Sequence, residues 1–153
     1  MRVFPGISSL SLGVRSVERA TVFYEMLGWR RTGQASTRAV SVFELNNLVL
    51  MLHPADALAQ DVGAQPPAQE TGFCVFTQNY GTAEGVGFAM AQARKAGGRI
   101  LRAAAADSFG RRDKTSDAAG ASGVFADPDG HIWTILHDPR LIPAVDGSIK
   151  PER

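Results

Sequence analysis

Hydrophobic and polar positions alternate along residues 7–14, which predicts a β-strand near the start of the chain. Leu10 and Leu12 belong to an apolar series, and Ser9 and Ser11 to the polar series between them. A period of two places the two series on opposite faces of a strand.

The pattern then changes to a period of three and four, which is typical of an amphipathic helix. Ser16 is placed to cap this helix, Glu18 falls in its first turn, where the helix dipole favours a negative charge, and Gly28 ends it. Three strands are predicted next, so the first half of the chain reads βαβββ; these strands cover residues 29–33, 38–45 and 48–52.

The second half of the chain repeats this order, so the sequence predicts one module written twice. A strand at 71–78 precedes a helix that Thr82 is placed to cap and that Gly97 and Gly98 close. A strand at 99–102 and a hairpin at 122–137 complete the second βαβββ unit. We therefore expect a single domain over residues 1–138 that is made of two modules, with module one at 6–53, a linker at 54–70 that holds a possible short helix at 55–62, module two at 71–138 and a tail at 139–153.

The hairpin turns at Asp127, Pro128, Asp129 and Gly130. Proline presets φ, aspartate side chains bond nearby backbone groups, and glycine permits a positive φ. The two aspartates are therefore interpreted as turn formers rather than as a general acid and base.

The largest difference between the modules is a polar segment at 103–121 that contains Arg111 and Arg112. Loops longer than about 12–15 residues inside compact domains are usually functional lids or disordered, and the sequence leaves both alternatives open. As a lid, the segment would bring its two guanidinium groups to an anionic or carbonyl-bearing ligand.

Composition and charge exclude several classes. The 153 residues are 44% apolar and carry a net charge of +1, which predicts one folded domain and argues against nucleic acid as a partner. Cys74 is the only cysteine, so no intrachain disulfide forms. No apolar run approaches the ~18–20 residues of a membrane span, and residues 1–6 do not read as a signal peptide. We expect a cytoplasmic protein with no membrane partner.

Two stretches carry a resemblance to a known family: SLSLGVRSVERATVFYEMLGW near the start, and VFADPDGHIWTIL near the end. Together with the repeat they resemble the vicinal oxygen chelate superfamily, which holds glyoxalase I, extradiol dioxygenases, fosfomycin-resistance transferases and bleomycin-resistance proteins. The resemblance implies an α+β fold in which two βαβββ modules form a half-open curved sheet around a cavity, with the helices outside. It also implies a homodimer.

Members of this superfamily usually hold a divalent metal with a His on each module's first strand and a Glu on each last strand. Carried over to this chain, the His positions fall on Ser9 and Phe73, and the Glu positions on Leu50 and Thr134. None of these side chains is an imidazole or carboxylate ligand. We therefore expect a member without the usual metal ligands, with no metal and no cofactor.

The three histidines and the cysteine are interpreted as structural. His53 and His137 lie three residues beyond Leu50 and Thr134, which places them on the helix side of the sheet. His131, in the turn, is expected to meet solvent or a backbone carbonyl. Cys74 is expected in the apolar core between sheet and helix.

The remaining inward positions would form a largely apolar pocket with a few hydroxyl groups, or else fill the same space as core, since both need the same alternation. Those expected to line the cavity are Ile7, Ser9, Ser11, Leu48, Leu50, Leu52, Phe73, Val75, Thr77, Ile132, Thr134 and Leu136, with Arg111 and Arg112 at its rim.

Two functions from different classes follow. The favoured one is a metal-free protein that binds a small hydrophobic or aromatic molecule. The alternative is a lyase or dioxygenase-type enzyme of the same superfamily, which is metal-independent or uses unrecognised ligands. The identity of the ligand does not follow from these residues.

Overall fold

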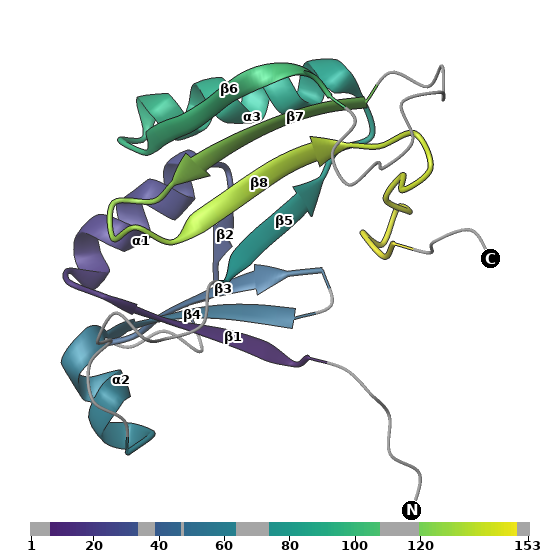
Figure 1. Cartoon of the computed structure of the whole chain (residues 1–153). Coiled ribbons are helices and arrows are strands. Elements are labelled where there is room, and N and C mark those ends of the chain that lie inside the picture. The colour runs from purple at the N-terminus through teal and green to yellow at the C-terminus, as the bar shows by residue number, and fades with distance from the viewer. Residues whose placement is uncertain (1–6, 34–38, 47, 64–73, 108–119, 150–153) are drawn as a thin grey trace, which may run out of the picture. The chain divides into compact units, whose positions relative to one another are not determined.

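A computed structural model describes residues 7–33, 39–46, 48–63, 74–107 and 120–149 (Figure 1). The chain divides into two compact units, Met1–Thr71 and Gly72–Arg153. Each unit holds one four-stranded mixed sheet. Two βαβββ units of an α+β fold are confirmed.

The first unit has the strand order β1-β4-β3-β2. Strand β1 pairs in parallel with β4, and the other pairs are antiparallel. Its elements are β1 (Ser9–Val14), α1 (Val17–Met26), β2 (Arg30–Arg31), β3 (Ser41–Leu45), β4 (Leu48–Pro54) and α2 (Ala55–Asp61).

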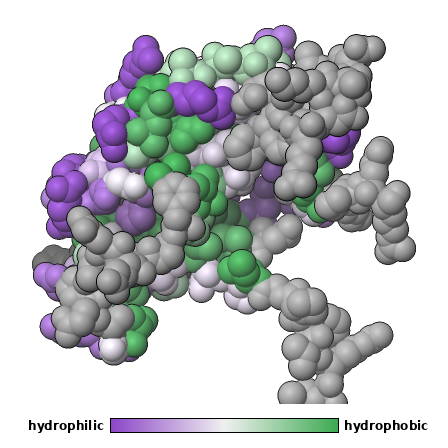
Figure 2. Space-filling view, viewed as in Figure 1, coloured by the Kyte–Doolittle hydropathy of each residue, from purple (hydrophilic) through white to green (hydrophobic). Residues whose placement is uncertain are grey.

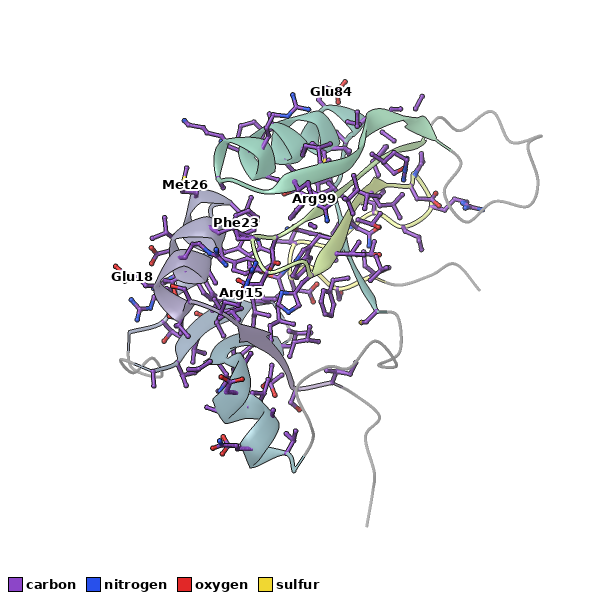
Figure 3. The ribbon with its side chains drawn as sticks, turned by 60° about the vertical axis from the view of Figure 1, so that its left-hand side comes forward. Arg15, Glu18, Phe23, Met26, Glu84 and Arg99 are labelled. Carbon is purple, nitrogen blue, oxygen red and sulfur yellow. The ribbon has the colours of Figure 1, made fainter. Side chains whose placement is uncertain are left out.

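Helix α1 forms where the sequence predicts it and covers one face of this sheet. The Ser16 hydroxyl accepts a hydrogen bond from the Arg19 amide at 3.2 Å, and Gly28 ends the helix with φ 87°. The ring of Tyr24 lies 5.9 Å from that of Phe43 on β3, and both residues are fully buried. In Figure 3 Glu18 lies on the outer side of α1, whereas Phe23, which is 1% exposed, belongs to the core.

The expected linker contributes a helix to the first unit. Helix α2 begins directly after β4, and Ala59 is buried within it. A Cβ atom on Gly13 of β1 would come 3.1 Å from Ala55 Cα. The backbones of β1 and α2 are this close because Gly13 has no side chain.

The second unit has the order β5-β8-β7-β6, with β5 parallel to β8 and the other pairs antiparallel. Helix α3 covers one face of its sheet (Figure 1). The Thr82 hydroxyl caps the helix by accepting from the Gly85 amide at 3.1 Å. The elements are β5 (Val75–Asn79), α3 (Ala83–Lys95), β6 (Arg99–Asp107), β7 (Gly120–Ala126) and β8 (Ile132–His137).

Strand β6 is longer than the sequence predicts. It runs nine residues, to Asp107, and β7 begins at Gly120, so both ends of the expected loop at 103–121 are strand. Residues 108–119, with Arg111 and Arg112, lie outside the described residues. Residues 103–106 are exposed alanines on this edge strand, pale green at the top of Figure 2.

The turn between β7 and β8 is organised by the Asp127 carboxylate, which confirms its interpretation as a turn former. Its Oδ1 accepts hydrogen bonds from the amides of Asp129 and His131, both at 2.9 Å. Its Oδ2 lies 2.8 Å from His131 Nδ1, so the partner of this imidazole is a carboxylate and not solvent or a carbonyl. Gly130 takes φ 97°.

The described part of the tail continues from β8 without further helices or strands. Arg140 of the tail forms an ion pair with Asp138, the residue after β8, in which Nη2 and Oδ2 lie 2.7 Å apart. Among the described residues, no helix is both long and apolar enough to cross a membrane.

Candidate functional site

Helix α1 packs on one face of the first sheet and α3 on one face of the second (Figure 1). We call the other faces the face opposite α1 in the first unit and the face opposite α3 in the second. Helix α2 lies against one end of the face opposite α1, where a Cβ atom on Gly13 would meet Ala55 and Leu58. Residues that pair across neighbouring strands point to the same side, so the register assigns every side chain to a face.

In the first unit the register places Leu50 and Ser9 on opposite faces of the sheet. Leu50 pairs with Leu10 and with Phe43, and it is fully buried on the α1 side. The expectation that Leu50 shares a face with Ser9 is therefore wrong. The side chains that share the face opposite α1 with Ser9 and Ser11 are Arg30, Val42, Glu44, Val49, Met51 and His53.

His53 is on this face and not on the α1 side. It pairs with Gly13, two residues beyond Ser11 on β1. The prediction counted three residues from Leu50, whose own face was misassigned. Its Nε2 atom is buried and has no hydrogen-bond partner among the residues that the structure describes.

In the second unit His137 lies on the helix side, as predicted. It pairs with Ala121, two residues from Gly123, which lies against Met90 of α3. Its Nδ1 atom is 3.0 Å from the carbonyl oxygen of Tyr80.

The face opposite α3 brings together five of the expected cavity residues: Val75, Thr77, Ile132, Thr134 and Leu136. Val75 pairs with Ile132 at one end of the strands, and Thr134 lies in the next row along. The other side chains on this face are Asn79, Arg99, Arg102, Ala105, Ser122, Val124 and Ala126. Phe73 lies outside the described residues.

Hydroxyl groups are buried within this largely apolar face. Thr134 is 1% exposed and Ser122 is 0% exposed. At the edge of the sheet, the Oδ1 atom of Asn79 is buried and has no hydrogen-bond partner in the described part of the chain. Buried polar groups are normally hydrogen-bonded, so Asn79 marks this face as one where an acceptor is available.

Arg102 reaches the same face because the first of two register shifts in β6 lies between Ile100 and Arg102. Ile100 pairs with Phe125, which is on the α3 side, and strict alternation would put Arg102 on that side too. One extra residue on β6 turns Arg102 to the other face, where it pairs with Val124. Its Nη2 atom then donates to Ser122 Oγ at 2.9 Å. No motif in the sequence points to Arg102 or Asn79 as a site residue.

The register also corrects the repeat. With the capping residues Ser16 and Thr82 superposed, Ser9 corresponds to Val75 and Ser11 to Thr77. Their partners across the sheet, Met51 and Thr134, then correspond as well. On this superposition the metal positions that the resemblance implies become Ser9, Met51, Val75 and Thr134, in place of Phe73 and Leu50.

These four side chains do not fit a divalent metal. They offer two hydroxyls, one thioether and one hydrocarbon, with no imidazole or carboxylate. Among the described residues, no three or more His, Cys, Asp or Glu side chains are grouped as a metal site would need.

Cys74 is exposed, which contradicts its expected place in the core. It precedes the first residue of β5, so the alternation that would direct it under α3 does not yet apply.

A separate groove of about 470 Å³ lies beside α1. It is on the helix side of the first unit, since Thr21 and Ser41, which line it, join α1 to β3 through a hydrogen bond of 2.6 Å. Its other lining residues are Val17, Glu18, Val22, Glu25 and Arg31.

The chain belongs to the Glyoxalase/Bleomycin resistance protein/Dioxygenase superfamily, whose family model matches residues 6–135. This confirms the resemblance that the two sequence stretches carry. No curated protein matches the chain.

Solved structures of the same family resemble this one. A glyoxalase-related enzyme from Fulvimarina pelagi is 28% identical with a TM-score of 0.81, over 96% of this chain and 98% of that one. A glyoxalase/bleomycin resistance protein/dioxygenase from Nocardioides is 19% identical with a TM-score of 0.66, over 90% and 85% of the two chains. A lactoylglutathione lyase from Agrobacterium tumefaciens is 13% identical with a TM-score of 0.61, over 86% and 92%. The last two likenesses concern the fold alone.

Proposed function

We propose that this protein binds a small hydrophobic or aromatic molecule without a metal ion. The observation that carries the proposal is the set of side chains at the four implied ligand positions. Ser9 and Met51 lie on the face opposite α1 and Val75 and Thr134 on the face opposite α3, and their side chains are hydroxyls, a thioether and a hydrocarbon in place of metal ligands.

The face opposite α3 supports this reading. Val124, Ile132 and Leu136 supply apolar surface, and Thr134 and Ser122 supply hydroxyl groups among them. Apolar walls with a few placed polar groups are typical of small-molecule sites, where the polar groups fix the orientation of the ligand.

The alternative is an enzyme of the same superfamily, of the lyase or dioxygenase type. Its support is the likeness to the glyoxalase-related enzyme from Fulvimarina pelagi. A shared fold does not fix chemistry, and the four implied metal positions carry no imidazole or carboxylate. Turnover of a bound compound, followed by chromatography, would favour the enzyme.

We further infer a cytoplasmic homodimer that binds no nucleic acid. The low net charge of +1 supports the last point, and sedimentation analysis tests the oligomeric state.

A thermal-shift screen of aromatic metabolites and antibiotics tests the proposed function. Compounds that stabilise the protein are then mapped by methyl NMR. We expect shifts at Val124 and Leu136, on the face opposite α3, and none at Ile135, which points to the α3 side. The proposal fails if no compound binds, or if binding perturbs only the groove beside α1.

A further inference from the structure

The groove beside α1 has a buried floor between two exposed walls. Helix α1 forms one wall, and Arg31 on the edge strand β2 forms the other. The floor consists of Thr21 and Ser41, which are 7% and 1% exposed. The volume of about 470 Å³ is typical of pockets that hold small molecules.

The hydrogen bonds at the floor fix the direction of each hydroxyl. Thr21 Oγ1 lies 2.6 Å from the carbonyl oxygen of Val17 and 2.6 Å from Ser41 Oγ. A carbonyl can only accept, so the Thr21 proton points to Val17, and Ser41 must then donate to Thr21. A hydroxyl has one proton and two lone pairs. Ser41 has therefore used its donor, and it presents an acceptor to the groove that it lines.

The sheet contributes to the groove at two levels along α1. At one level, Ser41 meets Thr21 through their hydrogen bond. At the next, Arg31 pairs with Phe43, whose ring lies 5.9 Å from that of Tyr24. Ser41 and Phe43 are two residues apart on β3, so the two levels are separated by about 7 Å.

The two carboxylates of the groove belong to different levels. Glu25 lies near the C-terminal end of α1, at the level of Arg31. Glu18 precedes Thr21 by about one helical turn, so it lies beyond the level of Ser41. Of the described residues that line the groove, Arg31 is the one cation. One end of the groove therefore combines a carboxylate with a hydroxyl acceptor, and the cation lies toward the other end.

We propose that this groove binds a protonated alkyl amine. The ammonium group donates to the Glu18 carboxylate and to Ser41 Oγ, which use two of its three N–H groups. The alkyl body lies along Val17 and Val22, both of which line the groove. This second site is independent of the proposed function, whose ligand is expected on the face opposite α3.

Glu18 also has a structural role, which a matched residue separates from binding. It lies in the first turn of α1, where the helix dipole favours a negative charge. Glu84 has the same position on α3, two residues after the N-cap, and it is exposed. Glu84 is not among the residues that line the groove. Glu84→Gln thus makes the same change to a helix and leaves the groove intact.

A smaller groove of about 210 Å³ between α3 and β6 provides a comparison within the molecule. Of the described residues that line it, Arg94 is the one that carries a charge. A ligand cation is repelled by Arg94 there, whereas two carboxylates attract it in the groove beside α1. Ile100, which lines the smaller groove, reports on binding at that place.

Methyl NMR titration of the full-length protein with butylamine, butanol, butyrate and the butyltrimethylammonium ion tests the proposal. Butylamine should shift the methyl groups of Val17 and Val22, and leave those of Ile100 and Val124 unchanged. It should bind more tightly than butanol, which has no charge, and butyrate should bind no more tightly than butanol. The butyltrimethylammonium ion keeps the charge and the alkyl chain but has no N–H, so it should bind more weakly than butylamine.

Substitutions separate the contacts. Glu18→Gln should weaken butylamine about threefold, as expected for one exposed charge pair, and Glu84→Gln should not weaken it. Ser41→Ala should weaken butylamine and leave the butyltrimethylammonium ion unchanged, since that ion has no N–H to donate. Arg31→Gln removes the cation and should tighten butylamine about twofold. Arg30→Gln, on the same strand and the opposite face, is its control and should have no effect.

Circular dichroism of each variant establishes that it is folded before its affinity is compared. The proposal is overturned if butylamine leaves Val17 and Val22 unshifted or binds no more tightly than butanol. It is also overturned if Glu18→Gln and Glu84→Gln have equal effects, or if Arg31→Gln weakens binding. If aromatic compounds shift Val124 and Leu136 while butylamine does not bind, this inference alone fails and the proposed function stands.

Discussion

Gly123 on β7 lies directly beneath Met90 on α3. A Cβ atom added to Gly123 would come within 2.8 Å of both Cγ and Sδ of Met90. Helix α3 therefore packs on the second sheet at a point where β7 has no side chain, and the Met90 side chain fills the space that results.

Gly123→Ala should destabilise the second unit by about 1–3 kcal/mol, because overpacking forces side chains off their rotamers. Met90→Ala makes room for the methyl group, so the double variant should lose less free energy of unfolding than the sum of the single variants. Urea unfolding measures all three. Gly87→Ala, on α3 with nothing within 4 Å of its added Cβ, is the control and should stabilise the helix by about 0.5–1 kcal/mol. Additive single effects would contradict this packing.

The Thr21 and Ser41 hydroxyls join α1 to β3 at 2.6 Å, and both residues are buried. Thr21→Val removes one partner and leaves the Ser41 hydroxyl unsatisfied, which should cost about 1–3 kcal/mol. The double variant Thr21→Val with Ser41→Ala removes both polar groups and should recover most of this loss. Chemical denaturation of the two single variants and the double variant measures their free energies of unfolding. If the double variant loses as much as the two single variants together, the two hydroxyls are not coupled.

Asn79→Leu should stabilise the protein. The Oδ1 atom of Asn79 is buried without a hydrogen bond to the described residues, and a buried unsatisfied polar group costs about 1–3 kcal/mol. We expect the melting temperature of the ligand-free protein to rise. Asn79→Asp, which would bury a charge, should lower it. If Asn79→Leu is less stable than the wild type, the amide is hydrogen-bonded in the native protein and the prediction is wrong.

Burial raises the pKa of Tyr80 above its ordinary value of about 10. Between that value and the higher pKa of the folded state, the unfolded chain loses the phenolic proton while the folded protein keeps it. The contribution of Tyr80 to the free energy of unfolding is therefore fully present below about pH 10, and it is lost as the pH rises further. Tyr80→Phe should reduce the fall in unfolding free energy above pH 10 and leave the profile below it unchanged. Identical profiles would contradict the prediction.

Dialysis against Zn²⁺, Mn²⁺ or Fe²⁺ should leave less than one metal ion per chain, measured by mass spectrometry of the metal. EDTA should not change the melting temperature. A micromolar site at millimolar metal would add about 4 kcal/mol of stability through mass action. Stoichiometric metal with a stabilisation of that size would reject metal-free binding.

The sequence predicts the fold where its pattern is unambiguous and fails where it is not. Ser9 and Ser11 alternate with Leu10 and Leu12, so the faces of β1 follow from the sequence alone. Residues 48–52 are all apolar, so no polar position fixes their phase, and Leu50 was assigned to the wrong face.

Strand β6 shows a second limit. Residues 103–106 are four alanines, which have low β propensity, so the strand was expected to end at Arg102. The two register shifts also break the alternation in this strand, and a residue's face cannot be counted across them.

The polar residues of the candidate site depend on long-range pairing. Asn79 ends β5 and Arg102 lies within β6, and neither belongs to a recognisable motif. The pairing of β8 with β5 and β7, together with the pairing of β7 with β6, places them on one face around Leu136 and Val124.

In each unit the first strand pairs in parallel with the last strand. This pairing decides when each sheet can be completed during translation. Strand β1 can pair with β4 only after Val49, the partner of Ser9, has been synthesised. Strand β5 needs Ile132, the partner of Val75, which is farther along the chain from it. As the chain leaves the ribosome, the first unit can close before the second has its last strand. Until Ile132 emerges, β5 is a strand without its partner, and unpaired strands are prone to aggregate. The nascent chain is thus most exposed to misassembly during synthesis of its second half.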